Sequence, residues 1–283
     1  MRIEINFRKD IADFFREELR VNGYKNIPDN ERGLIDAYFK VMHRIISFVP
    51  RKIKKSDVFK CPSELIQGLE ILENKIFKGE NINPYQSEGV MDIKINDALL
   101  NDWGILHLHL GVEKNANGFI KRSGPLLYVF FTEDTAYFLN VLGHGEWTNK
   151  SLLEILDRNW SGLLGRQANI IDIEELDSDS MKKIRKAGGT FFTKVNSKIF
   201  APPGGGYATA GNSISAVMQS NHLLMKLREY ENWIRNNERY FEKRVRRLVN
   251  ANVFKLELKP VIKKGILLAI DKNYNISFEL GNI

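Results

Sequence analysis

The strongest constraint on the fold is a strict alternation of apolar and polar residues, ILHLHL, over residues 105–110. Side chains of a β-strand point to the two faces of a sheet in turn, so this alternation predicts a strand. The three leucines of the run would face the core. His107 and His109 would then share the opposite face, which we expect to be open.

Two further strand-like runs follow the first one. They read PLLYVFF and AYFLNVL, and the residues TEDT at Thr132–Thr135 join them as a β-hairpin. Together with the histidine strand they predict a small antiparallel sheet. A helix is expected next, because Leu152, Leu153 and Leu156 recur at helical spacing after the capping residues Thr148 or Asn149.

The segments on either side of this sheet have different characters. Before it, the runs IADFFREELR, GLIDAYFKVMHRIISFV and ELIQGLEILENKIF show helical periodicity, with a basic linker, RKIKK, between the last two. After it come a charged helix, two short strands, a glycine-rich loop, one long helical pattern over residues 214–249 and a hairpin that turns at residues 272–275. We therefore expect an α+β fold with a helical N-terminal region (residues 1–90), the antiparallel-sheet core (91–165) and a basic α+β C-terminal region (166–283).

The cysteine content and the hydropathy of the sequence indicate the cellular compartment of the protein. Cys61 is the single cysteine, so no internal disulfide can form, which is typical of a reducing cytoplasm. The charged N-terminus does not resemble a signal peptide. No window approaches the run of about 18 apolar residues that a membrane span needs. The sequence therefore predicts a cytoplasmic protein without a membrane partner.

Positive charge is concentrated in one segment. The net charge is +7, and residues 222–272 contain thirteen Lys and Arg against six Asp and Glu, so this segment carries the whole excess. A localised basic face is typical of a polyanion partner such as RNA. The aromatic residues of this segment recur at helical spacing, which is more typical of a core than of a surface that stacks on bases. The candidates for contacts to RNA phosphates are therefore the cations Arg239, Lys243, Arg244, Arg246 and Arg247. The alternative is a solvated helix face.

His107 and His109 allow three interpretations together with His144, which follows the third strand. They could act as general acid and base, since an imidazole exchanges protons near neutral pH. Three imidazoles could instead hold a zinc ion with a fourth position open to water. In the third interpretation they hydrogen-bond within the sheet or bind a partner protein. Arg122, before the second strand, could supply a cation to a phosphate.

The run HLHLG, then KRSGPLLYVFF, then AYFLNVLGHGEWTNKSLLEIL resembles the core of the RelE/ParE superfamily of bacterial toxins. The resemblance covers residues 100–165. It implies a small antiparallel sheet that cleaves mRNA by metal-free acid–base chemistry and an antitoxin as partner. By resemblance, His107 and His109 match the polar strand, Arg122 the arginine of the next strand, and His144 with Trp147 the segment after the last strand. The lysine-rich tail of the family reads GEWTNK here, and the chain is much longer than a typical member.

A glycine-rich loop, PPGGGYATAGNS, precedes the long helix. It matches neither the P-loop nor the dinucleotide-binding pattern. Its three glycines could approach an anion and Tyr207 could stack on a base. The alternative is a tight connection between a strand and a helix.

The functional hypothesis is a ribonuclease-like toxin or phage-defence effector that needs no metal or other cofactor. His107 and His109 would be acid and base, Arg122 the phosphate clamp, and His144 a further proton-transfer or orienting group. The alternative is a non-enzymatic nucleic-acid-binding or regulatory subunit of a defence or toxin–antitoxin system. Expected partners are RNA, an antitoxin or another protein, and a second copy of the chain through the long C-terminal helix.

Overall fold

A computed structural model describes residues 2–143, 150–165, 167–169, 172–173, 176–187, 189–206, 213–249, 255–263 and 265–282. The chain divides into two compact units. The terminal unit comprises Met1–Phe39 with Val217–Ile283, and the central unit comprises Lys40–Ala216. The fold is α+β, as the sequence predicts, and includes the long C-terminal helix.

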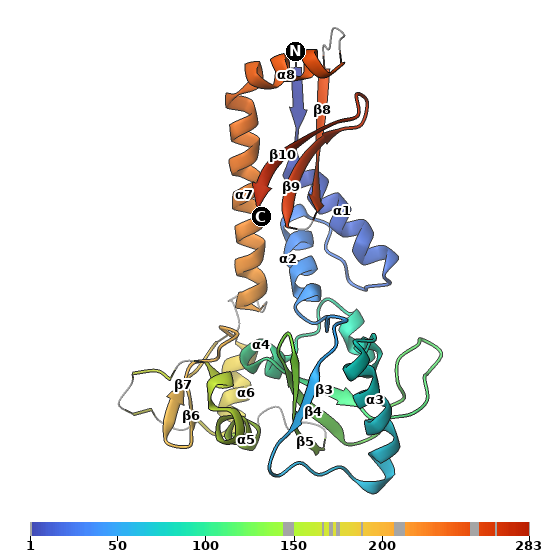
Figure 1. The fold of residues 1–283 in the computed structure, drawn as a ribbon. Helices are drawn as coiled ribbons and strands as arrows, with labels where there is room; N and C mark the ends of the chain where they lie inside the picture. Colours follow the sequence, from blue (N-terminus) through green and yellow to red (C-terminus); the bar gives the residue numbers. More distant parts are fainter. Residues whose placement is uncertain are drawn as a thin grey trace. The chain divides into compact units, whose positions relative to one another are not determined.

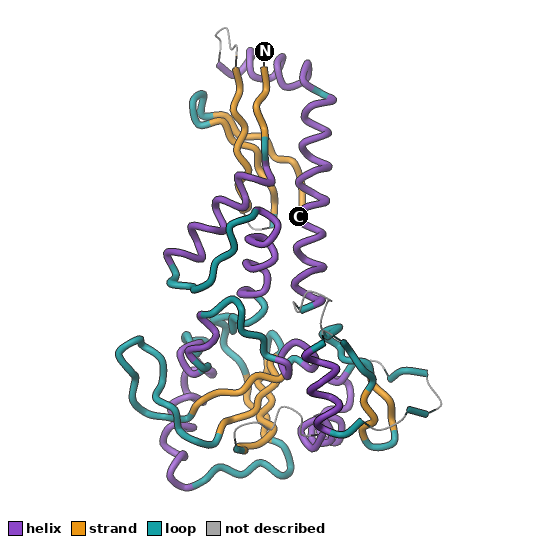
Figure 2. The backbone as a smooth tube through the Cα atoms, turned by 180° about the vertical axis from the view of Figure 1, so that it is seen from behind, coloured by secondary structure: helices purple, strands orange, loops and turns teal. Residues whose placement is uncertain are grey.

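Both ends of the chain build the terminal unit. Its elements are β1 (Arg2–Ile5), α1 (Phe7–Val21), α2 (Glu31–Met42), α7 (Ile214–Asn236), α8 (Glu238–Val249), β8 (Lys255–Lys263), β9 (Ile266–Asp271) and β10 (Ile276–Asn282), where α2 and α7 run on into the central unit. The strands form one sheet in the order β1-β8-β9-β10, in which β1 is parallel to β8. Figure 2 shows α7 beside these strands, and its residues Leu223, Leu227 and Ile234 pack into their core.

The central unit contains the predicted histidine strand. Its sheet has the order β2-β5-β4-β3, with β3, β4 and β5 antiparallel and β2 parallel to β5. The elements are β2 (Lys52–Lys55), η1 (Ser63–Leu65), α3 (Ile66–Lys78), η2 (Asn83–Tyr85), η3 (Glu88–Met91), α4 (Ala98–Trp103), β3 (Ile105–His109), β4 (Leu126–Phe131), β5 (Thr135–Leu142), α5 (Lys150–Trp160), η5 (Ser161–Leu164), α6 (Ser178–Lys186), β6 (Thr193–Val195) and β7 (Lys198–Phe200).

Helices cover both faces of this sheet. Apolar residues of α3 pack with the leucines of β3 on one face, and those of α4 and α5 pack with Ile105 and Tyr128 on the other. Figure 1 shows α3 on one side of the sheet and α5 on the other. The expectation that His107 and His109 both project from an open face is therefore wrong, because His109 is buried there while His107 stays partly exposed.

The structure divides the chain differently from the three consecutive regions that the sequence suggests. The first residues are a strand rather than helix, and Ile3 pairs with Leu256 across most of the chain. This pairing places both termini around one core. The basic linker is strand β2, and the long helical pattern is two helices, because the chain turns at Asn237. Local periodicity carries no information about parallel pairing between distant segments.

Candidate functional site

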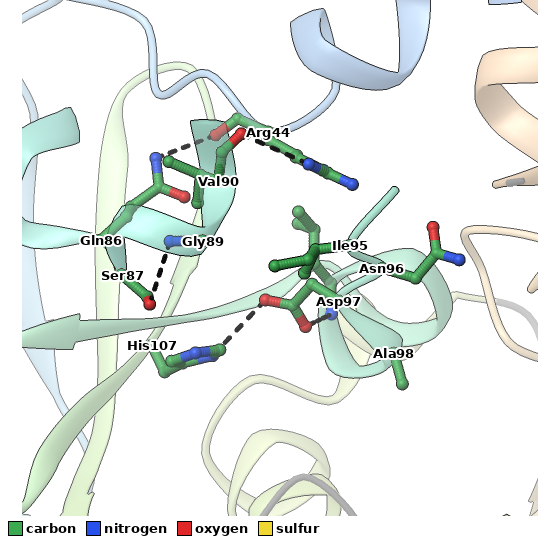
Figure 3. A pocket seen from close by; sticks show the side chains of 11 residues that line it. Arg44, Gln86, Ser87, Gly89, Val90, Ile95, Asn96, Asp97, Ala98 and His107 are labelled. Carbon is green, nitrogen blue, oxygen red and sulfur yellow. Dashed lines mark hydrogen bonds and ion pairs between the residues drawn. The ribbon is translucent and has the colours of Figure 1, made fainter. Parts of the chain in front are cut away.

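A cavity of about 390 Å³ lies in the central unit. It is lined by residues of η3 and α4, by the segments before each, by Arg44 after α2 and by His107 of β3. Figure 3 shows Arg44 on one side of it and His107 with Asp97 on the other. The cavity therefore combines a fixed cation, a carboxylate and an imidazole.

His107 is the only histidine that lines this cavity among the residues that the structure describes. Its side chain is 30% exposed, and Nδ1 lies 3.5 Å from Oδ2 of Asp97. The other oxygen, Asp97 Oδ1, accepts a hydrogen bond from the backbone N–H of Leu100 at 3.0 Å. Asp97 is thus the N-cap of α4, and this cap fixes the carboxylate beside the imidazole.

Arg44 supplies positive charge on the opposite side. Its Nη1 donates to the carbonyl oxygens of Val90 and Asp92, at 3.4 and 3.1 Å. The Arg44 carbonyl in turn accepts a bond from Nε2 of Gln86 at 3.0 Å. These contacts hold a buried guanidinium in one position. Neither Arg44 nor Asp97 was predicted from the sequence, although Asp97 carries a capping signal in front of the short helix ALLNDW.

A second cation lies one helical turn before Arg44. Burial and, to a smaller extent, repulsion from Arg44 lower the pKa of the Lys40 amine to about 8, against the opposing effect of Asp92. The amine is therefore partly neutral just above physiological pH. Lys40 does not line the cavity.

His109 does not join His107 in the cavity. Both residues lie on the face of β3 that α4 and α5 cover, but His109 is 1% exposed whereas His107 lies at the cavity. An imidazole enclosed in this way cannot exchange protons with a large substrate. The predicted accessible pair, His107 and His109, is therefore reduced to His107.

Arg122 is also placed away from the cavity. It is exposed in the segment before β4, next to Ser123, whose Oγ accepts a bond from the N–H of Leu110. It does not line the cavity, so the structure does not bring it to His107 as a phosphate clamp. His144, Trp147 and Tyr207, which were predicted to contribute to the site, lie outside the described residues.

The glycine-rich loop is packed against other parts of the chain where the structure describes it. The N–H of Gly204 donates to the carbonyl of Asp102 at 3.0 Å, and a Cβ at this position would collide with the carbonyl of Asn101. A Cβ on Gly206 would collide with Thr190. These glycines permit close packing, which agrees with the tight connection rather than with an open anion cradle.

The five cations proposed as RNA contacts are all exposed on α8. They are Arg239, Lys243, Arg244, Arg246 and Arg247. Arg246 pairs with Glu242 at 2.6 Å, one turn away. The opposite face of the helix is buried through Phe241 and Val245. The basic residues therefore form one solvent-facing surface of the terminal unit. This exposure agrees with both interpretations, a surface that binds a polyanion and a helix face that is only solvated.

Among the residues that the structure describes, no group of three His, Cys, Asp or Glu side chains is placed to hold a metal ion. None of the described helices combines the length and the apolar composition of a transmembrane segment.

Comparison of the chain with protein-family models, with curated proteins and with solved structures finds no match.

Proposed function

We propose that the protein is a ribonuclease-like effector of the toxin or phage-defence kind, which cleaves RNA in the cytoplasm by acid–base chemistry without a metal ion. The observation that supports this proposal best is the contact of 3.5 Å between His107 Nδ1 and Asp97 Oδ2, in a cavity that also contains the Arg44 guanidinium. By the family resemblance, a partner protein that covers the cavity would restrain the activity.

The chemistry follows from the pairing of the imidazole. A carboxylate at Nδ1 stabilises the tautomer with the proton on Nδ1, which leaves the lone pair of Nε2 as the base. Nε2 of His107 takes the proton of a 2′-hydroxyl, the 2′-oxygen bonds to phosphorus, and the bond from phosphorus to the 5′-oxygen breaks. The leaving oxygen takes a proton from solvent. Arg44 stabilises the negative charge of the phosphorane.

The test is incubation of purified protein with bulk RNA, with and without chelator. We expect cleavage in both conditions and a loss of about 10²- to 10⁴-fold in His107→Ala, the usual effect of removing a general base. His222→Ala is the matched control, because His222 is an exposed histidine of the terminal unit. Cleavage by His107→Ala at the wild-type rate would eliminate the proposal.

Asp97→Asn separates the two roles of Asp97. The amide oxygen of Asn still accepts the bond from the N–H of Leu100, so the cap and the melting temperature should be retained. The negative charge beside His107 is lost, and we expect the cleavage rate to fall at least about tenfold. A variant that melts normally and cleaves like the wild type would show that the carboxylate has no catalytic role.

A second candidate is a non-enzymatic nucleic-acid-binding or regulatory subunit, which the exposed cations of α8 favour. In that case the protein binds RNA without cutting it. Replacement of Arg244, Arg246 and Arg247 by alanine would then remove function, and His107→Ala would not.

A further inference from the structure

The corner between α7 and α8 brings two aromatic side chains together. At Asn237, Nδ2 donates to the carbonyl of Trp233 at 2.8 Å, and the Asn237 carbonyl accepts a bond from the N–H of Tyr240 at 2.9 Å. These bonds hold the last turn of α7 next to the first turn of α8. As a result, the ring centroids of Trp233 and Tyr240 lie 6.2 Å apart.

Both rings are exposed although they rest on a rigid support. Trp233 is 44% and Tyr240 is 48% exposed. Beneath them lies the fully buried ring of Phe241, which makes edge contacts to Trp233 at 5.3 Å and to Tyr240 at 5.4 Å. Large aromatic rings normally bury most of their surface, so two exposed rings fixed by a third one indicate a surface that contacts a partner.

A cation lies beside Tyr240, in a segment that is rich in positive charge. Arg244 donates to the Tyr240 hydroxyl at 2.9 Å, and its guanidinium lies over the ring of Phe278 at 5.9 Å. Residues 235–247 contain six Arg and Lys against two Glu. Rings set among cations are the combination that single-stranded nucleic acids bind, because the bases stack on the rings and the phosphates contact the cations.

We propose that Trp233 and Tyr240 form a stacking platform for unpaired bases of RNA, with Arg244 as a phosphate contact beside it. A duplex keeps its base faces stacked internally, so the platform would favour single strands. The proposal names the substrate class for the RNA cleavage proposed above and rests on it for its biological role. The binding itself does not require cleavage.

Binding is measured by fluorescence anisotropy in a His107→Ala background, so that a cleavage result cannot obscure it. The probes are a labelled oligouridine of about 12 nucleotides and an RNA duplex of the same length. We expect Trp233→Ala and Tyr240→Ala each to raise the Kd for the single strand about tenfold and to leave the Kd for the duplex unchanged. Trp233→Phe keeps a ring and should restore most of the affinity.

Two further variants keep the test decisive. Trp233→Leu retains apolar packing on Phe241 but lacks a ring, so it covers the case in which the alanine variant fails to fold. Phe77→Ala removes a 70% exposed ring from the central unit and should change neither Kd. Unchanged single-strand affinity in folded Trp233→Leu and in Tyr240→Ala would overturn the proposal and leave a protein partner as the role of these rings.

Discussion

At the scale of single residues, Gly68 determines how closely α3 approaches the sheet. It lies within α3 against the backbone carbonyl of Leu110, and a Cβ at this position would collide with that carbonyl. Replacement of a helical glycine by alanine normally stabilises by about 0.5–1 kcal/mol. For Gly68→Ala we expect the opposite, a loss of about 1–3 kcal/mol in unfolding free energy, measured by urea titration.

The matched control for this prediction is Gly162→Ala. A Cβ on Gly162, in η5, would meet nothing within 4 Å. Its unfolding free energy should stay within about 0.5 kcal/mol of the wild type. Equal stability of both variants would contradict the close approach of α3 to Leu110.

At the scale of elements, Arg51 attaches the edge strand β2 to the rest of its sheet. Its Nε donates to the carbonyl of Thr132 at 2.7 Å, in the turn between β4 and β5. Two further bonds run from its guanidinium to the carbonyl and hydroxyl of Ser47, at 2.9 and 2.6 Å. The buried guanidinium therefore joins the segment before β2 to the hairpin of β4 and β5. Strand β2 pairs with β5, the second strand of that hairpin.

Arg51→Met should destabilise the central unit through the loss of these charged hydrogen bonds. Each such bond contributes about 1.5–3 kcal/mol, and the carbonyl of Thr132 would lose this donor. We expect a fall in melting temperature by calorimetry, whereas Lys52→Met, at an exposed neighbouring position, should leave it nearly unchanged. Equal effects of the two substitutions would show that Arg51 does not hold β2.

At the scale of the whole molecule, the terminal and central units each have their own hydrophobic core. We expect two unfolding transitions in denaturant, because separate cores need not unfold together. Leu72→Ala should weaken the transition of the central unit by about 2–5 kcal/mol, and Phe241→Ala that of the terminal unit by about 3–5 kcal/mol. A single transition that both variants shift equally would show that the two cores unfold as one.

Local signals predicted many elements correctly. The helix expected over ELIQGLEILENKIF forms as η1 and α3, and the hairpins at Thr132–Thr135 and at residues 272–275 form as expected. Strands β1 and β2 were missed. Each has four residues, and each pairs in parallel with a segment far away in the sequence, which no short-range pattern reveals.

The sequence by itself determined that apolar and polar residues alternate along β3 and that His107 and His109 share one of its faces. It also determined that the excess of positive charge lies in the C-terminal part of the chain. Only the tertiary structure decided how accessible each residue is. Helices α4 and α5 cover the face that the histidines share, where His109 is buried and His107 lies at the cavity with Asp97 and Arg44. The physical reason is that burial depends on segments that arrive from elsewhere in the chain, whereas periodicity fixes only the direction in which a side chain points.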